Sequence, residues 1–210
     1  MLKTRIAVLV SGGGTNLQAL IDAEHSGQLK SGKIMLVISN NADAAALTRA
    51  YNNGIPQEIV LKSKCGSQEN FEAKIIEHLK RYEIDLIVLA GFMSILSKDF
   101  TSQYPERIIN VHPSLIPSFC GKGFYGIKVH EAALNYGVKV TGATVHFVNE
   151  IPDGGEIILQ KAVNICKSDT PESLQQRVMR IAEWKILPKA VEMVSKDISA
   201  DKEKNKNGHI

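Results

Sequence analysis

Two polar residues close an apolar run in the stretch INVHPSLIP, at residues 109–117. In a strand, residues i and i+2 point to the same face, so Asn110 and His112 are expected side by side. Pro113 has no backbone N–H and cannot continue a central strand, which predicts a strand end at His112. Ligands of open α/β sheets bind beyond the carboxyl ends of the strands. The pair is therefore placed where a ligand could bind, although a buried His and Asn that only satisfy each other fit the same pattern.

A carboxylate could join this pair from a turn further along the chain. The turn PDGG, at residues 152–155, carries Asp153. A carboxylate beside an imidazole stabilises the protonated ring, so Asp153 is predicted to raise the pKa of His112. A protonated His112 and the amide of Asn110 can both stabilise an oxyanion. These residue types favour acyl transfer without a nucleophilic serine or cysteine, in which the substrate supplies the nucleophile.

The stretch SGGGTNL, at residues 11–17, joins a predicted strand to a predicted helix, which is where α/β folds hold phosphates. No lysine follows the glycines, so the loop is not a Walker motif. A dinucleotide fingerprint needs a third glycine where Leu17 stands, and the second predicted strand ends in SNNAD, without an acidic residue at its tip. A phosphate monoester therefore fits the loop better than a dinucleotide, and a tight turn without a ligand is the alternative.

Strands and helices alternate along the first half of the chain. Apolar runs predict strands at 5–10, 33–39, 57–61, 85–92 and 107–112, and helical spacing predicts helices at 15–27, 43–53 and 68–82. Strands that are apolar on both faces and alternate with helices are typical of parallel sheets. The pattern predicts a Rossmann-like α/β fold, with a mostly parallel sheet and helices on both faces.

The second half of the chain breaks this alternation. Residues 138–149 and 156–165 are predicted strands with only a short turn between them, too short for a crossover helix, so an antiparallel addition to the sheet is expected. Thr170 is predicted to cap a last helix, which Pro188 kinks or ends.

The remaining organisation is simple. Residues 1–192 are predicted to form a single domain, and the charged residues 193–210 a frayed tail.

The net charge of +3 comes without a basic stripe interleaved with aromatic residues, so no nucleic-acid partner is predicted. The N-terminal apolar run leads into the glycine loop without a cleavage pattern, and no run approaches the roughly 20 residues that span a membrane. Three widely spaced cysteines without a C-x-x-C pair indicate reduced thiols and a cytoplasmic protein.

No metal site is predicted either. His112, His146 and Asp153 are of types that bind metals, but no local ligand pair such as H-E-x-x-H supports one. His146 lies in an alternating strand and is expected to be structural. His130, at a predicted helix start beside a glycine-rich stretch, is expected to face solvent.

Six motifs are specific in combination: SGGGTNLQAL, VISNNADA, LAGFMSILS, NVHPSLIPSF, GATVHFVNEIPDGGEIILQ and EWKILP. Through them the chain resembles the glycinamide ribonucleotide formyltransferases, folate-dependent enzymes of purine synthesis, over most of its length. The resemblance implies a formyltransferase-type fold for residues 1–192. It also implies 10-formyltetrahydrofolate as a co-substrate and transfer of its formyl group to the amine of N1-(5-phospho-D-ribosyl)glycinamide, without a metal.

The resemblance further implies which residues do this work. The catalytic residues would be Asn110, His112 and Asp153. The ribonucleotide and its phosphate would contact Gly14, Thr15, Asn16, Glu183 and, with less regular spacing, Arg180. The folate would contact the 148–153 loop and Gln68, Met93, Ser94, Ile95, Leu96 and Asn110. The family often has arginine where this chain has Ser94, and a basic residue at Gln68, so altered contacts with the glutamate tail of the folate are expected.

Other functions fit parts of the same pattern. A formyltetrahydrofolate deformylase is similar in the catalytic segments, but it carries an additional N-terminal domain, and the first strand is predicted near the start of this chain. A methionyl-tRNA formyltransferase needs a C-terminal RNA-binding domain, for which residues 190–210 leave no room. A non-catalytic nucleotide- or folate-binding module would not need Asn110, His112 and Asp153 together. A monomer or weak homodimer that binds only small molecules is expected.

Overall fold

The computed structural model describes residues 2–207 of the 210-residue chain. The strands are β1 Thr4–Val10, β2 Gly32–Ser39, β3 Gln57–Ile59, β4 Leu86–Leu89, β5 Ile108–His112, β6 Val140–Phe147 and β7 Ile157–Asn164. The α-helices are α1 Thr15–His25, α2 Ala45–Asn52, α3 Gln68–Arg81, α4 Lys98–Thr101, α5 Ile127–Tyr136, α6 Pro171–Val178 and α7 Trp184–Asn207. A 3₁₀ turn covers Lys62–Lys64, and a π-helix covers Met179–Glu183. Within residues 2–207, every helix is too short or too polar to cross a membrane.

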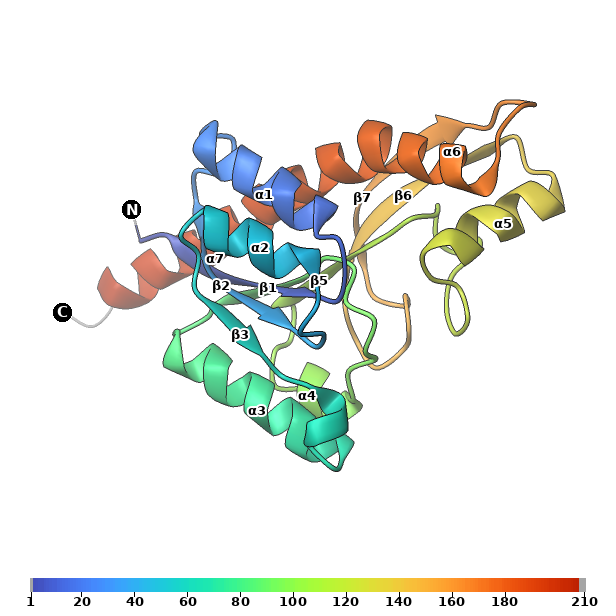
Figure 1. Ribbon diagram of the computed structural model, residues 1–210. Helices are drawn as coiled ribbons and strands as arrows, with labels where there is room; N and C mark the ends of the chain where they lie inside the picture. Colours follow the sequence, from blue (N-terminus) through green and yellow to red (C-terminus); the bar gives the residue numbers. More distant parts are fainter. Residues whose placement is uncertain (1, 208–210) are drawn as a thin grey trace.

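The strands form one seven-stranded sheet in the order β3-β2-β1-β4-β5-β6-β7. All neighbours from β3 to β5 are parallel, whereas β6 pairs antiparallel with β5 and β7 antiparallel with β6. Helices α1, α2 and α7 lie on one side of the sheet, and α3 and α4 lie on the other (Figure 1). The predicted mostly parallel α/β fold with an antiparallel addition is confirmed.

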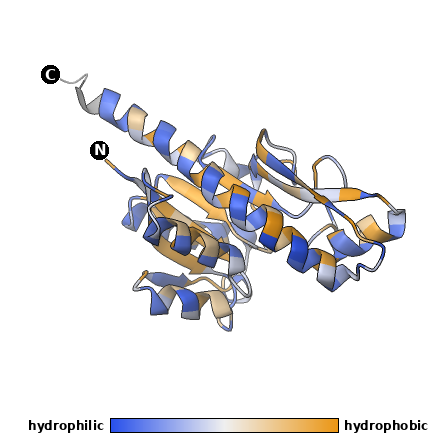
Figure 2. Cartoon of the chain, turned by 90° about the horizontal axis from the view of Figure 1, so that it is seen from above, coloured by the Kyte–Doolittle hydropathy of each residue, from blue (hydrophilic) through white to orange (hydrophobic). Residues whose placement is uncertain are grey.

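The central strands build two cores, one on each side of the sheet. Along β1, Ile6 and Val8 pack with α1, α2 and α7, while Ala7 and Leu9 pack with α3. All four side chains are fully buried, as expected from the alternation of faces along a strand. The strands accordingly appear as hydrophobic arrows beneath amphipathic helices (Figure 2). Polar side chains are therefore confined mainly to the strand ends and the connections beyond them.

The glycine loop turns sharply at Gly14, directly before α1. Gly14 has φ 70°, a left-handed conformation that glycine adopts without a steric penalty. A Cβ atom at this position would also lie 2.6 Å from the Cβ of Ala46 in α2. The loop is thus pressed against α2, and both the conformation and the close approach require glycine.

Pro188 does not end the last helical segment, so that part of the prediction is wrong. Helix α6 passes through the π-helix Met179–Glu183 into α7, and Pro188 lies inside α7. The missing N–H of Pro188 would have bonded to the carbonyl of Trp184, the first residue of α7. Only one hydrogen bond is lost there, next to a turn that already departs from α-helical spacing.

The prediction of a frayed tail is wrong for residues 193–207, because α7 continues to Asn207. Val194 and Ile198 are 7% and 3% exposed and belong to the core above the sheet. The hydroxyl of Thr4 donates a hydrogen bond of 2.7 Å to the carbonyl of Ser195. Up to Ser199, exposed charged residues such as Lys196 and Asp197 alternate with buried residues at helical spacing, and a count of charges alone missed this spacing. Residues 208–210 lie outside the described part of the chain.

This correction can be tested by truncating one side chain from each face of α7. Ile198→Ala is expected to lower the free energy of unfolding by about 2–4 kcal/mol, because it removes buried atoms and leaves a cavity. Met193→Ala is the matched control, since Met193 is 43% exposed, and a change of about 0.5 kcal/mol is expected. Urea unfolding of both variants measures the difference. Equal, small effects would indicate that this part of α7 is not packed on the core.

Candidate active site

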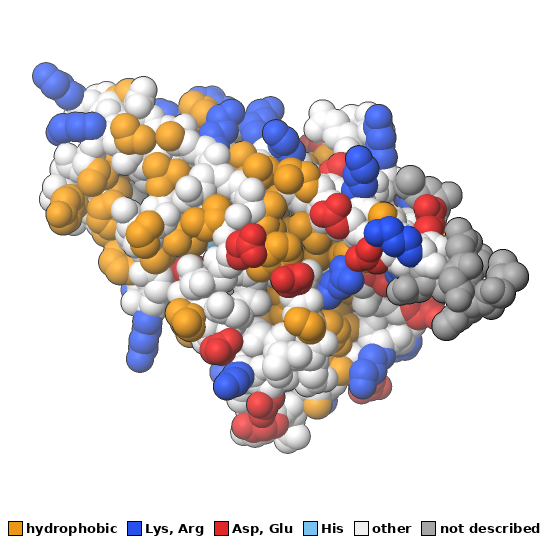
Figure 3. All heavy atoms as spheres, turned by 180° about the vertical axis from the view of Figure 1, so that it is seen from behind, with side chains coloured by type: hydrophobic (Ala, Val, Ile, Leu, Met, Phe, Trp, Pro, Cys, Tyr) orange, Lys and Arg blue, Asp and Glu red, His pale blue; other side chains and the backbone are white. Residues whose placement is uncertain are grey.

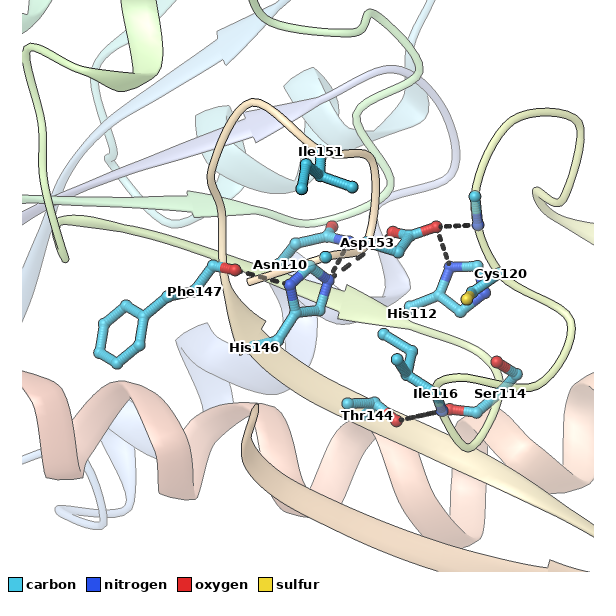
Figure 4. Close-up of polar contacts among 12 residues, drawn as sticks. Asn110, His112, Ser114, Ile116, Cys120, Thr144, His146, Phe147, Ile151 and Asp153 are labelled. Atoms are coloured by element: carbon cyan, nitrogen blue, oxygen red, sulfur yellow. Dashed lines mark hydrogen bonds and ion pairs between the residues drawn. The ribbon is translucent and has the colours of Figure 1, made fainter. Parts of the chain in front are cut away.

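The side chains of Asn110, His112 and Asp153 come together beyond the end of β5 (Figure 4). Asn110 and His112 project from β5, and Asp153 comes from the loop between β6 and β7. The Nδ1 atom of His112 lies 3.5 Å from Oδ2 of Asp153. Thr144 on β6 fixes the turn that follows His112, because its hydroxyl donates to the carbonyl of Ser114 at 2.7 Å. The sequence predicted these three side chains at one edge of the sheet. The structure brings His112 and Asp153 into contact and links Asn110 to them through His146.

Asp153 is held as a carboxylate by its surroundings. The backbone N–H of Gly121 donates to Oδ2 at 2.8 Å, and Nε2 of His146 lies 3.7 Å from Oδ1. Burial by itself raises the pKa of Asp153, but His146, His112 and the Gly121 N–H together outweigh it, so the pKa is lowered. Asp153 adopts φ 57°, a left-handed conformation that is uncommon outside glycine and Asn or Asp. A charged group thus sits at a strained turn, held by contacts from three directions.

His112 does not have the raised pKa that the sequence predicted. Its side chain is almost entirely buried, and burial lowers the pKa of the ring more than the Asp153 carboxylate and the Phe119 carbonyl raise it. The Nε2 atom lies 2.9 Å from the carbonyl oxygen of Phe119, which can only accept a hydrogen bond. Nε2 therefore carries a proton, and Nδ1 is the atom that faces Asp153. The carboxylate acts in the expected direction, but the enclosure of the ring outweighs it.

His146 is a member of this cluster that sequence reasoning assigned only a structural place. It is 1% exposed and pairs across the strands with Asn110. Its Nδ1 lies 2.7 Å from the carbonyl oxygen of Phe147 and must donate to it. Nε2 lies 3.2 Å from Nδ2 of Asn110 and 3.7 Å from Oδ1 of Asp153. In the neutral ring Nε2 accepts a hydrogen bond from the Asn110 amide, and only in the protonated ring can it donate to the Asp153 carboxylate. His146 fixes which way the Asn110 amide points, and only the register of β5 and β6 could have revealed this.

His130 was expected to face solvent, and this prediction is wrong. It is completely buried on α5, where Val129 and Ala133 are buried as well. Neither ring nitrogen has a hydrogen-bond partner within the described residues. Burial, and secondarily the nearby His112, lower the pKa of His130 to about 4. His130 is consequently a neutral side chain at neutral pH, packed behind the site.

The glycine loop meets the π-helix at a buried polar pair. Nδ2 of Asn16 donates to Oε2 of Glu183 at 2.7 Å, and both residues are buried. Burial raises the pKa of Glu183 to about 7, against the opposing effect of the Asn16 hydrogen bond. The hydroxyl of Thr15 lies 3.7 Å from the sulfur of Met179, in the first position of the π-helix. The structure thus brings Thr15, Asn16 and Glu183 together.

Arg180, the remaining residue of the expected ribonucleotide set, is not part of this cluster. Its side chain is exposed on the π-helix. In the described part of the chain no hydrogen bond or ion pair joins it to the glycine loop or to Glu183.

The segment from Met93 to Leu96 follows β4 and ends before α4. Met93 and Ile95 are 53% and 65% exposed, whereas Leu96 is buried. The backbone N–H of Met93 donates to the hydroxyl of Ser11 at 2.8 Å, and Nδ2 of Asn40 donates to the hydroxyl of Ser94 at 2.8 Å. Nε2 of Gln68 donates to the carbonyl of Ile95 at 3.1 Å. All five residues expected to contact a folate outside β5 therefore lie in one connected region.

One further side chain bears on the chemistry of the cluster. Cys120 lies beside His112 (Figure 4), and burial, together with Asp153, raises the pKa of its thiol. The protonated thiol is a poor nucleophile. Among the described residues no group of three His, Cys, Asp or Glu side chains is arranged to hold a metal ion. What the cluster offers is a hydrogen-bonded imidazole, an oriented amide and a carboxylate.

Comparisons with known proteins agree with this arrangement. The formyl transferase family model matches residues 4–191. The phosphoribosylglycinamide formyltransferase of Haemophilus influenzae is 44% identical over 184 residues, which cover 88% of this chain and 84% of that protein. The human trifunctional purine biosynthetic protein adenosine-3 is 45% identical over 193 residues, which cover 92% of this chain. The chain spans only 18% of the length of that trifunctional protein.

Solved structures show the same likeness in three dimensions. The glycinamide ribonucleotide transformylase 1 of Symbiobacterium toebii superposes with a TM-score of 0.87 at 39% identity, covering 93% of this chain and 89% of that one. The phosphoribosylglycinamide formyltransferase of Coxiella burnetii gives a TM-score of 0.85 at 40% identity, covering 93% and 88% of the two chains. Sequence, fold and site geometry agree, and the chain belongs to the formyl transferase family, among the phosphoribosylglycinamide formyltransferases.

Proposed function

We propose that this protein transfers the formyl group of 10-formyltetrahydrofolate to the amine of N1-(5-phospho-D-ribosyl)glycinamide. The products are the N-formyl ribonucleotide and tetrahydrofolate, and the reaction is a step of de novo purine synthesis. The observation that carries the proposal is the contact between His112 and Asp153 at the end of β5, with the amide of Asn110 beside them. Such a set can stabilise the oxyanion of acyl transfer, and the substrate amine supplies the nucleophile.

The order of the strands supports two substrate subsites beside this set. The glycine loop follows β1, the Met93–Leu96 segment follows β4, and His112 ends β5. These three strands are parallel neighbours in the sheet, so their carboxyl ends lie next to one another. The ribonucleotide phosphate would bind at Gly14, Thr15 and Asn16, and the folate at the segment after β4. Holding both substrates beside His112 could supply several kcal/mol of the barrier reduction by proximity alone, as a rough estimate.

The chemistry then follows in two steps. The amine nitrogen attacks the formyl carbon, a C–N bond forms, and the carbonyl electron pair moves to the oxygen, which Asn110 and His112 stabilise. The bond between the formyl carbon and N10 of the folate then breaks. One proton leaves the amine nitrogen and one arrives at N10, so the overall reaction needs no other reactant. Once the Phe119 carbonyl has moved away from Nε2, the neutral ring can carry its proton on Nδ1, towards Asp153. The free Nε2 can then accept the proton of the amine, as an imidazolium that Asp153 stabilises, and return it to N10.

The Phe119 carbonyl limits how His112 can take part. In the present conformation it accepts a hydrogen bond from the N–H at Nε2. A substrate atom can therefore meet Nε2 only after the turn at Phe119 has shifted.

The proposal also covers the bounds of the domain, the compartment, the oligomeric state and the partners of the protein. We place the formyltransferase unit at residues 1–192, which the family match over residues 4–191 supports. We also propose a cytoplasmic monomer or weak homodimer that acts on small molecules. On the face seen in Figure 3, acidic and basic side chains are interspersed, which does not favour nucleic acid as a partner.

The function is tested by following the formyl donor with and without the amine. Loss of the formyl group from 10-formyltetrahydrofolate is expected only when N1-(5-phospho-D-ribosyl)glycinamide is present, with one formylated product for each tetrahydrofolate formed. Absorbance of the folate and mass spectrometry of the product measure the two sides. Steady turnover without the amine would instead identify a deformylase. Absence of both reactions, with binding retained, would identify a non-catalytic binding module.

Substitutions within the cluster test the mechanism. His112→Ala is expected to lower kcat at least about 100-fold, because it removes the group that takes and returns the proton. Asn110→Ala is expected to lower kcat by about 100-fold through the loss of one oxyanion donor. His25→Ala is the control, since His25 is exposed at the end of α1. Circular dichroism and thermal unfolding should show that the variants fold. Near-normal turnover in His112→Ala would overturn the mechanism.

The pKa of Glu183 predicts how ribonucleotide binding depends on pH. Because its folded-state pKa is raised from 4.5 to about 7, the carboxyl is ionised above that pH and protonated below it. If the carboxylate accepts hydrogen bonds from the ribonucleotide, KM for this substrate should rise by about tenfold from pH 8 to pH 6, as the ionised fraction falls. Glu183→Gln cannot titrate, so the comparison removes the contribution of the substrate's own groups. Parallel KM profiles for the two proteins would show that Glu183 does not act in this way.

A further inference from the structure

The segment between β4 and α4 is held in place almost entirely by side chains. Within the described residues, no backbone–backbone hydrogen bond ends on residues 91–96. The Ser11 hydroxyl accepts a hydrogen bond from this segment, and the side-chain amides of Asn40 and Gln68 donate to it. Its conformation therefore depends on residues far away in the sequence, and a change in one of them can move it without unfolding the sheet.

Glu72 anchors the end of this segment. It lies on α3, is 5% exposed, and faces the start of α4. Its Oε1 accepts from the backbone N–H of Ser97 at 2.6 Å, and its Oε2 accepts from the Ser97 hydroxyl at 2.5 Å. Ser97 in turn caps α4, because its Oγ accepts from the backbone N–H of Phe100 at 3.1 Å. The carboxylate thus fixes both the end of the segment and the first turn of α4.

Gln68 links the same carboxylate to the middle of the segment. Its Nε2 donates to Oε1 of Glu72 at 2.5 Å and to the carbonyl of Ile95 at 3.1 Å. An amide nitrogen has two hydrogens, and both are used here. Gln68 consequently has no amide donor left for a ligand in this conformation, and it acts on the segment instead. We call Gln68, Glu72 and Ser97 the Glu72 clamp.

We infer that Glu72 is a positioning residue for the formyl donor, and that the Glu72 clamp sets the place of Met93–Leu96 at the folate subsite. The inference rests on the proposed function, which places the folate on this segment. Within the described chain, none of the clamp residues contacts Asn110, His112 or Asp153, so the clamp acts on donor binding and not on the chemical step. A segment that is already in place does not have to be ordered when the donor binds, which lowers the cost of binding.

Removing the charge of Glu72 disturbs the clamp in a defined way. In Glu72→Gln one side-chain atom remains an acceptor, but the other becomes an amide nitrogen that faces a second donor. If the nitrogen takes the place of Oε1, the Ser97 N–H and the Gln68 amide both lose their acceptor. If it takes the place of Oε2, the Ser97 hydroxyl loses its acceptor and has to turn to accept from the new amide. A buried donor without a partner is costly. The segment is released at Ile95 or at Ser97, while the strands and the cluster at β5 are left unchanged.

The test separates the two Michaelis constants in the full-length protein. Glu72→Gln is expected to raise KM for 10-formyltetrahydrofolate about tenfold, with KM for the ribonucleotide and kcat changed by less than about twofold. Glu77→Gln is the matched control, because it removes the same charge from an exposed position of α3 and should change neither constant. Ser97→Ala should raise the donor KM as Glu72→Gln does. Ser97→Thr keeps the hydroxyl, so its donor KM should stay near the wild-type value.

Each outcome decides a different point. If the wild-type protein transfers the formyl group and both Glu72→Gln and Ser97→Ala keep a normal donor KM, the inference is wrong and the proposed function stands. If both Michaelis constants rise together and kcat falls, the clamp serves general stability only, which also overturns the inference. If Glu72→Gln does not fold, the Ser97→Ala and Ser97→Thr pair gives the same answer. No transfer by the wild-type protein would overturn the proposed function and this inference with it.

Discussion

The parallel pairing of β1, β4 and β5 is the constraint on which the site depends. Strands that are buried on both faces leave almost no room for polar side chains along their length. Parallel neighbours also end at the same edge, so the connections after all three strands meet there. The glycine loop, the Met93–Leu96 segment and His112 are adjacent for this reason, although they lie far apart in the sequence. The apolar core and the polar site are two results of one arrangement.

The antiparallel strand β6 adds what the parallel strands cannot. It pairs His146 with Asn110 and Thr144 with His112, so both polar residues of β5 have a polar partner on the neighbouring strand. The loop after β6 then returns Asp153 to the imidazole. A carboxylate inside a protein is costly unless it is paired and hydrogen-bonded, and Asp153 has contacts with His112, His146 and the Gly121 N–H. The left-handed turn at Asp153 is the local strain that accompanies this arrangement.

Most features that depend on neighbouring residues were predicted correctly from the sequence, whereas several features that depend on contacts between distant parts of the chain were missed. Strand and helix patterns, the strand end at Pro113 and the shared face of Asn110 and His112 are local properties, and the structure agrees with them. The pairing of His146 with Asn110 depends on the register between two strands, which no local pattern carries. The burial of His130 and the pKa of His112 depend on how completely α5 and the connection that precedes it enclose the site. Both predictions were wrong for this reason. In residues 193–207 the helical spacing was present, but the charges concealed it.

The two proposed subsites are fastened on opposite sides of the sheet. The ribonucleotide side depends on Asn16 and Glu183, which belong to α1 and the π-helix above the sheet. The donor side depends on the Glu72 clamp, which belongs to α3 and α4 below it. Among the described residues, the two cores lie on opposite faces of the central strands β1 and β4, whose side chains are buried on both faces. Each substrate can therefore be bound by its own layer, and the cluster at the end of β5, between the layers, is where the two must meet.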